Sequence, residues 1–283
     1  MRLVLGPSRR PRLLLGAALL AAFVITSSAL ARSSGSITPP PSIAKAGKVN
    51  FCMDWTNPPE EFHNGATLVG SDVDIGRRIA SLLGVKAQFS YLGFDGLIAA
   101  LIGHKCDAII SGMNDTPARA KQVNFVDYLS IGQAMIVTKQ HFFHVNTIEQ
   151  LSGKTVSSQS GTTEYQELQQ VNTKLAKQHK PLITIKLYPT GSDGEEALRL
   201  NKVDAVFDEA PVIAYYIKRF PSIYTFGSPQ FFTEPVGIAV AKDNAALTAA
   251  IRAAVTKSYG DGSMCKILKG WQMTSFALKG RTC

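Results

Sequence analysis

The stretch Asp107–Arg119 carries the residue types and spacing best suited to bind a carboxylate. Residues 108–110 are apolar, which is typical of a strand buried on both faces of a parallel sheet. The run ends at Ser111-Gly112, and Thr116-Pro117 then predicts the start of a short helix with Arg119 in its first turn. Hydroxyls, backbone N–H groups and a guanidinium would converge there, as a carboxylate requires. The alternative is an ordinary strand-to-helix junction with a solvated arginine.

The elements that must position this stretch alternate between strand and helix. Residues 49–53 and 85–92 predict strands, and apolar residues at helical spacing predict helices over 75–83 and 97–102. With the strand at 108–110, this order indicates a parallel sheet with right-handed crossovers. The polar and aromatic loop after the first strand begins at Asp54 and Trp55, where a ligand would meet the edge of such a sheet.

A second unit of the same kind follows downstream. Strands are predicted over 153–156, 182–187 and 203–207, the last ending at Asp208. A helix begins after Gln159-Ser160-Gly161-Thr162-Thr163, and another spans 193–200. The chain therefore predicts two lobes of similar construction.

The two halves share a short sequence pattern, Lys-x-Asp-Ala, which occurs at 105–108 and at 202–205 after a helix. Four residues beyond each aspartate stand Ser111 and Asp208, which we therefore expect at equivalent strand ends. Apolar stretches at 131–138 and 236–241 would connect the lobes. The mostly helical part from 245 onward would return to the first lobe, which leaves a cleft and a two-strand hinge.

The first 31 residues predict a secretory signal peptide. Residues 9–12 hold three arginines, 13–25 are apolar, and Ala29-Leu30-Ala31 matches the small-residue cleavage pattern. The apolar run is too short to span a bilayer. No cysteine stands at the cleavage point, so we do not expect a lipid anchor. We expect cleavage after Ala31 and a periplasmic mature protein.

The remaining chain divides into a linker and two lobes. Residues 32–47 are rich in serine and proline and predict a flexible N-terminal tether. We place lobe 1 over 48–131 and 237–283, and lobe 2 over 132–236.

Charge and cysteine content exclude some classes of function. Loss of the signal peptide removes four arginines, so the formal net charge falls from +9 to +5. The other basic residues are scattered, without the stripe that nucleic-acid binding needs. All four cysteines lie in the mature chain, which fits an oxidising compartment. Three pairings are possible, and we favour Cys52–Cys106 between two predicted strands together with Cys265–Cys283.

Several motifs, in order along the chain, resemble those of solute-binding family 3, the polar amino-acid-binding proteins of ABC importers. The matching residues are 94–98, 107–113, 116–119, 125–128, 159–163 and 204–208. The resemblance implies an α/β, two-lobed type II periplasmic binding protein fold, with a parallel-dominated sheet in each lobe. It also implies capture of an L-amino acid and delivery to a membrane permease, without catalysis.

The resemblance implies which residues hold the ligand. Arg119 would bind the α-carboxylate with help from Ser111, Gly112, Asn114, Thr162 and Thr163. Asp208 would bind the α-ammonium group. Phe94, Asp54 and Trp55 would line the side-chain pocket. A zwitterion needs one fixed cation and one fixed anion, and because each lobe supplies one of them, binding would favour closure.

Three positions depart from the family pattern. Asn114-Asp115-Thr116 stands where Thr-Ile-Thr is usual, Asn57 where an aromatic residue is common, and Glu60 where phenylalanine is usual. These departures leave the ligand's side chain open. Because Asp54 and Glu60 would favour a cation, we expect a polar or basic amino acid.

Two alternatives remain. A periplasmic cyclohexadienyl dehydratase shares the fold and needs a general acid in the cleft, which Glu209 or Asp115 could supply. A receptor sensor domain would need a membrane segment beyond Cys283. His141 and His144 have no acidic or cysteine partner nearby in the sequence, so we expect neither a metal nor a cofactor. We expect a monomer.

Overall fold

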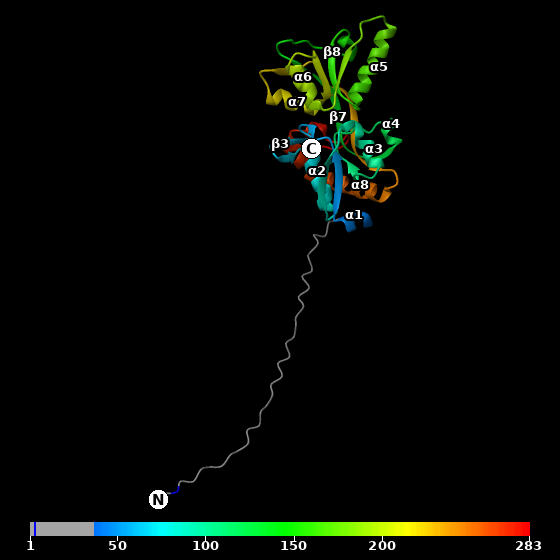
Figure 1. The fold of residues 1–283 in the computed structure, drawn as a ribbon, viewed down its shortest axis with the longest axis vertical. Helices are drawn as coiled ribbons and strands as arrows, with labels where there is room; N and C mark the ends of the chain where they lie inside the picture. Colours follow the sequence, from blue (N-terminus) through cyan, green and yellow to red (C-terminus); the bar gives the residue numbers. More distant parts are fainter. Residues whose placement is uncertain (1–2, 4–36) are drawn as a thin grey trace. The chain divides into compact units, whose positions relative to one another are not determined.

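The computed structural model describes Leu3 and residues 37–283. Apart from Leu3, the predicted signal peptide lies outside the described residues. Residues 32–36 of the predicted tether also lie outside them. Residues 37–283 form two lobes. In Figure 1, α5 and α6 lie with β8 in one lobe, α2, α3 and α8 lie in the other, and β7 passes between them.

The expectation of a flexible tether is wrong for residues 37–47. Helix α1 (Pro41–Ala46) occupies this stretch, with proline at its start and Gly47 in the left-handed conformation at its end. Ile43 is only 2% exposed and packs in the core of lobe 1. Proline suits the first turn of a helix as well as an extended linker. Composition alone therefore could not show that Ile43 would find a core.

Lobe 1 contains a parallel strand trio covered by helices. Strand β1 (Lys48–Met53) pairs with both β5 (Lys86–Tyr91) and β6 (Ala108–Ile109). The helical elements between these strands are α2 (Ser71–Leu82), η1 (Phe94–Gly96) and α3 (Leu97–Ile102). A small antiparallel sheet, which was not predicted, is inserted after β1 and consists of β2 (Thr56–Asn57), β3 (Glu61–Asn64) and β4 (Thr67–Val69).

Lobe 2 repeats the trio. Strand β8 (Thr155–Gln159) pairs in parallel with β9 (Thr184–Tyr188) and β10 (Ala205–Glu209). Its helices are η2 (Ile148–Leu151), α5 (Thr163–Lys177), α6 (Gly191–Arg199) and α7 (Ala210–Arg219). Helix α7 was not predicted, because only Asp208 and Glu209, the last two residues of β10, separate the apolar residues of that strand from those of the helix.

Two long antiparallel strands, β7 (Val123–Thr138) and β12 (Phe231–Ala241), form the two-strand hinge. They contain the predicted connections, residues 131–138 and 236–241. Strand β12 pairs with β6 of lobe 1, and β7 pairs with β10 of lobe 2, so the strands form one sheet in the order β5-β1-β6-β12-β7-β10-β8-β9. Strand β11 (Tyr224–Phe226) adds to β7.

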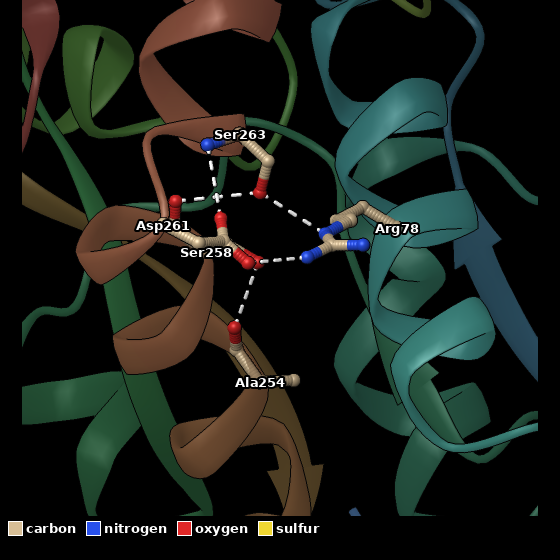
Figure 2. Close-up of polar contacts among 5 residues, drawn as sticks. All are labelled: Arg78, Ala254, Ser258, Asp261 and Ser263. Carbon is tan, nitrogen blue, oxygen red and sulfur yellow. Dashed lines mark hydrogen bonds and ion pairs between the residues drawn. The ribbon is translucent and has the colours of Figure 1, made fainter. Parts of the chain in front are cut away.

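The C-terminal helices return to lobe 1, as predicted. They are α8 (Ala245–Gly260), α9 (Ser263–Trp271) and η3 (Thr274–Phe276). Leu247, Ile251 and Leu268 pack in the same core as Ile43. Figure 2 shows how Arg78 of α2 joins the turn between α8 and α9: its Nε donates to Ser263 Oγ at 3.0 Å, and its Nη2 pairs with Asp261.

Both favoured disulfides are present. Cys52 and Cys106 are bonded with their Cα atoms 5.8 Å apart, and they tie β1 to the residues that lead into β6. Cys265 and Cys283 are bonded near the C-terminus.

Candidate functional site

A small cavity lies between the lobes, beyond the C-terminal ends of β1, β6, β8 and β10. Its lining residues come from both lobes: Asp54, Asn57, Glu61, Phe94, Ser111, Gly112, Asn114, Gln159, Thr162, Glu164, Asp208 and Glu209. The cavity has a volume of about 20 Å³, room for about one water molecule. The cleft is therefore shut, and the lobes must part before an amino acid can enter.

Asp54 follows β1 and connects the two lobes. Its backbone N–H donates to Ser111 Oγ at 3.0 Å, and its carboxylate accepts a hydrogen bond from the Phe94 N–H at 3.2 Å. The same carboxylate accepts from Gln159 Nε2 of lobe 2 at 2.7 Å. Burial raises the pKa of Asp54, and its hydrogen bonds oppose that rise.

The turn after β6 presents Ser111 and Gly112 to the cavity. Ser111 Oγ donates to Glu61 Oε1 at 2.7 Å, and the Gly112 N–H donates to Asp72 Oδ2 at 2.9 Å. Gly112 has φ +52°, and a Cβ atom there would lie 2.9 Å from Glu209 Oε2. The positive φ therefore favours glycine at this position, and a larger residue would also make the Glu209 side chain move.

Arg119 is positioned by the short helix α4 (Pro117–Ala120), as predicted. Proline stands at its start, and the Thr116 hydroxyl accepts a hydrogen bond from the Arg119 N–H at 3.2 Å. This N-cap places Arg119 in the first turn, beside the strand end that carries Ser111.

The Arg119 guanidinium reaches across the cleft. It donates to the Asn114 carbonyl at 3.1 Å and to the Gly161 carbonyl of lobe 2 at 3.0 Å, and it lies 5.4 Å from the centre of the Phe94 ring. The residue is 7% exposed, and among residues 37–283 no carboxylate oxygen lies within 4.0 Å of it. Burial lowers its pKa. A buried guanidinium without a carboxylate partner is costly, and a ligand carboxylate would supply that partner.

Thr162 and Thr163 stand at the N-terminus of α5 in lobe 2. The Thr162 hydroxyl accepts from the Tyr165 N–H at 3.4 Å and so caps the helix. The Thr163 hydroxyl donates to Asn114 Oδ1 of lobe 1 at 2.9 Å. Asn114, one of the departures from the family pattern, thus forms a direct contact between the lobes.

Asp208 stands at the end of β10 and lines the cavity. One carboxylate oxygen accepts from the Glu209 N–H at 2.7 Å. Burial, followed by the nearby Glu164 carboxyl group, raises the pKa of Asp208 to about 8. In the shut cleft at neutral pH this carboxyl group therefore keeps its proton, and a cation beside it would favour ionisation.

The lining of the cavity is strongly acidic. Its carboxyl groups belong to Asp54, Glu61, Glu164, Asp208 and Glu209. Burial is the largest cause that raises the pKa of each. Within residues 37–283 none of them has a lysine or arginine nitrogen within 4.0 Å. The site therefore has a surplus of acidic groups that a cationic ligand could neutralise.

The structure brings together most of the predicted site residues. Those that line the cavity are Asp54, Phe94, Ser111, Gly112, Asn114, Thr162 and Asp208. Arg119 and Thr163 lie directly beside it through their hydrogen bonds to Asn114.

Trp55 is not brought into the cavity. It lines a separate hollow, with its ring centre 5.0 Å from that of Tyr91 and 5.2 Å from that of His63. Trp55 lies in a tight turn, which is closed by a hydrogen bond from the Thr56 N–H to the Asp54 carbonyl at 2.8 Å. The turn places the Trp55 ring in that hollow and leaves Asp54 in the cavity lining.

Several lining residues were not predicted as ligand contacts: Asn57, Glu61, Gln159, Glu164 and Glu209. Gln159 opens the motif that ends at Thr163, and Glu209 follows Asp208, so adjacency to predicted residues was the available signal. For Glu61 and Glu164 the sequence offers only charged residues next to predicted turns, which is also how solvent-exposed residues appear.

Comparison with known proteins decides the family. The family model described as bacterial extracellular solute-binding proteins, family 3, matches residues 49–274. The chain belongs to this family. The ABC transporter arginine-binding protein 1 of Escherichia coli (strain K12) is 30% identical over 231 residues, which cover 80% of this chain and 91% of that protein.

Solved structures of amino acid-binding proteins also match this family 3 protein. An ancestral arginine-binding protein bound to arginine superposes with a TM-score of 0.74 at 34% identity, covering 80% of this chain and 98% of that one. An ancestral amino acid-binding protein, described as a precursor of cyclohexadienyl dehydratase, gives a TM-score of 0.73 at 28% identity, covering 81% and 97%. These relatives are named as binding proteins, and they share the two-lobed type II fold of this family 3 protein.

Within Leu3 and residues 37–283, no helix of this solute-binding protein combines the length and apolar character needed to cross a bilayer. In the same part of the chain, no three His, Cys, Asp or Glu side chains are arranged to hold a metal ion.

Proposed function

We propose that this solute-binding protein captures an L-amino acid with a polar or basic side chain between its lobes and delivers it to the permease of an ABC importer. The observation that carries the proposal is Arg119, a buried guanidinium without a carboxylate partner among the described residues, beside a cavity lined by carboxyl groups. One cation among several acids complements a zwitterion, because the ligand's carboxylate pairs with the arginine and its ammonium group with an acid.

Each ligand group has a proposed partner. Arg119 binds the α-carboxylate together with Ser111, Gly112, Asn114, Thr162 and Thr163. Asp208 binds the α-ammonium group, and Phe94 and Asp54 border the ligand's side chain. For this to occur the carbonyl contacts of Arg119 and the Thr163–Asn114 hydrogen bond must loosen when the lobes part.

The acidic lining favours a basic side chain over a neutral one. A neutral amino acid brings one positive charge to a site with five lining carboxyl groups, whereas arginine or lysine brings two. Matched relatives are named as arginine-binding proteins. Arginine is therefore the first ligand to test.

The same charges disfavour the dehydratase alternative. Its prephenate-like substrate carries carboxylates but no cation, so it would leave the acidic groups of the lining without a positive partner. Arg119 and Asp208 together instead suit an intact amino acid. The proposal therefore does not include catalysis.

The proposal also covers location, domain limits and assembly. Residues 1–31 act as a signal peptide removed after Ala31, and the mature protein works in the periplasm as a monomer. Lobe 1 comprises 48–131 and 237–283, and lobe 2 comprises 132–236. The two disulfides suit an oxidising compartment.

Isothermal titration calorimetry on the purified mature chain tests the proposal. L-arginine, L-lysine, L-glutamine and L-glutamate are titrated separately, with D-arginine as the stereochemical control. We expect binding of the L-amino acids in the order basic, neutral, acidic, and none of D-arginine. Absence of binding to every L-amino acid, together with consumption of prephenate, would overturn the proposal in favour of the enzyme.

A further inference from the structure

A larger cavity between the lobes lies apart from the one that is proposed to hold the amino acid. Its volume is about 420 Å³, which is within the range of small-molecule sites. One wall is α7 of lobe 2, and the other is formed by Pro59, residues 270–273 and Phe276 of lobe 1. In Figure 1, α7 faces the part of lobe 1 that holds the C-terminus. Within residues 37–283 the two cavities share no lining residue, so this one is a separate place for a ligand.

Aromatic side chains from both lobes line this interlobe cavity. Tyr215 of α7 and Trp271 of α9 both lie against the Phe62 ring, with ring centres 5.4 and 5.9 Å from it. The Trp271 indole is also held by a hydrogen bond from its Nε1 to Asp74 Oδ2 at 2.9 Å. Phe276 packs against the cores of both lobes. The rings are therefore fixed in advance, as a site for a flat apolar group requires.

Two cations stand at the rim of the same cavity, in the last turn of α7. Lys218 and Arg219 are exposed and belong to its lining. Lys218 Nζ donates to Gln272 Oε1 of lobe 1 at 2.7 Å, and the Arg219 guanidinium lies 5.6 Å from the centre of the Phe220 ring. Among residues 37–283 neither cation has a carboxylate oxygen within 4.0 Å, and no carboxyl group lines the cavity. The cavity therefore offers positive charge that is not neutralised.

The helix ends at this cavity do not reverse the sign of its charge. Both α7 and α9 end here, and the C-terminal end of a helix carries a partial charge of about −0.5. Lys218 and Arg219 each carry a full positive charge, and Lys269 adds another in the last turn of α9. The cations outweigh the helix ends, so an anion is favoured.

We propose that the interlobe cavity is a second binding site, which takes a small aromatic carboxylate. The ring of this ligand lies against Tyr215, Trp271 and Phe276, and its carboxylate pairs with Lys218 and Arg219. Because the walls come from both lobes, the ligand contacts both only when the lobes are shut. It therefore favours closure, and the two ligands raise each other's affinity by the same factor. This coupling rests on the proposed function, whereas the site itself does not.

Calorimetry with indole-3-acetate tests the site, and indole-3-acetamide serves as its neutral isostere. Saturating L-arginine fills the amino acid cavity during the titration. Under this condition we expect the acetate to bind about 10-fold more tightly than the acetamide. Lys218→Glu and Arg219→Glu should each remove this preference. Ala214→Trp adds an indole to the lining and should abolish binding of both compounds.

Lys177→Glu is the matched control. Lys177 is exposed and stands in the last turn of α5, so it matches Lys218 in lobe, charge and helix position, but it does not line the cavity. This variant should bind the acetate as the wild type does. Without L-arginine, the affinity of the wild type for the acetate should be about 5-fold lower.

Three results would overturn the site. They are equal affinity of the wild type for acetate and acetamide, displacement of the acetate by L-arginine, and unchanged acetate binding in Lys218→Glu, Arg219→Glu and Ala214→Trp. The first comparison needs only the wild type, so it decides the matter even if a variant fails to fold. If L-arginine does not bind, the proposed function and the coupling fail. The preference of the wild type for acetate over acetamide then still decides whether the second site exists.

Discussion

The two lobes use the same scaffold and differ at the strand ends. In lobe 1 the Asp107 carboxylate accepts from the Asn50 N–H at 2.7 Å, and in lobe 2 the Asp204 carboxylate accepts from the Thr155 N–H at 2.7 Å. The strand register agrees as well, with Phe51 opposite Ala108 in one lobe and Val156 opposite Ala205 in the other. The shared Lys-x-Asp-Ala pattern thus marks a shared structural position.

The differences begin where the shared strands end. Lobe 1 presents Ser111 and the nearby Arg119, whereas lobe 2 presents Asp208 at the position equivalent to Ser111. The register also aligns the disulfide pair Cys52–Cys106 with Ser157 and Val203, which are not cross-linked. The comparison indicates that one framework was adapted twice, to a carboxylate-binding end in lobe 1 and to an acidic end in lobe 2.

The largest expected effect on ligand binding comes from removing the charged group that each lobe supplies. Arg119→Met should remove the buried cation beside the cavity and abolish measurable binding of L-arginine, a loss of about 3–5 kcal/mol, because the ligand carboxylate would be buried unpaired. Asp208→Asn should weaken binding less, since other carboxyl groups line the same cavity. Calorimetry measures both, and circular dichroism checks folding. Equal losses in the two variants would contradict the assignment of separate roles.

The Cys52–Cys106 disulfide of lobe 1 provides a second test of how closely the two lobes correspond. Cys52→Ala with Cys106→Ala opens a loop of 54 residues and should lower the free energy of unfolding by about 4 kcal/mol. Ser157→Cys with Val203→Cys should transfer the disulfide to lobe 2, because the strand registers match. Urea denaturation under oxidising and reducing conditions reports both effects. If the new cysteine pair does not form a disulfide, the structural equivalence of the two lobes is weaker than the register indicates.

Buried acids of the two lobes should also affect the stability of the protein over different pH ranges. The pKa of Asp208 in lobe 2 is raised to about 8 and that of Asp72 in lobe 1 to about 6, mainly by burial. The folded protein retains protons on these two residues that the unfolded chain loses near pH 4. Their contribution to the stability of the ligand-free protein should therefore fall as pH rises from about 4 and be lost above about pH 8.

Asp208→Asn should remove about 1–3 kcal/mol of that fall between pH 4 and 8. Asp72→Asn should remove only the part of the fall in stability that occurs below about pH 6. Thermal or urea unfolding across this pH range measures the difference. A stability that rises from pH 5 to pH 8 in the ligand-free wild type would contradict the burial of protonated acids.

The smallest effect tests the shared scaffold itself. Asp107→Ala and Asp204→Ala each remove one hydrogen bond from a backbone N–H of a neighbouring strand and should each cost about 1–2 kcal/mol of stability. Neither side chain lines the cavity, so arginine affinity should be unchanged. Chemical denaturation and calorimetry on both variants check this. A marked difference between the two losses would show that the equivalent positions are not energetically equivalent.

Local patterns predicted most of the fold because they reflect local physics. Thr116-Pro117 predicted an N-cap that the structure contains, and Gly84 follows α2 as a stop signal should. The prediction failed where a pattern suits two structures. Prolines near residue 40 suit both a linker and a helix start, and the apolar stretch around 205–219 contains both a strand and a helix.

The site was predictable in part for a similar reason. Residues at strand ends and helix starts, such as Ser111 and Asp208, follow from the order of the elements. Glu61 and Glu164 could not be singled out, because a glutamate in a turn or in a first helical turn is more often solvated than buried. The side that Trp55 faces depends on the small sheet that follows it, which was not predicted.

By itself, the sequence determined the two-lobed plan, the disulfide pairs that the cysteine positions favoured, and the types of residue that could bind a zwitterion. Each depends on neighbours within a few residues or on a repeated local pattern. Only the tertiary structure decided which acids approach one another. Glu60 of lobe 1 and Glu209 of lobe 2 both reach Gly112, where a Cβ atom would lie 3.5 Å and 2.9 Å from their Oε2 atoms. Charge–charge and burial effects act through space, and sequence separation does not encode distance across a cleft.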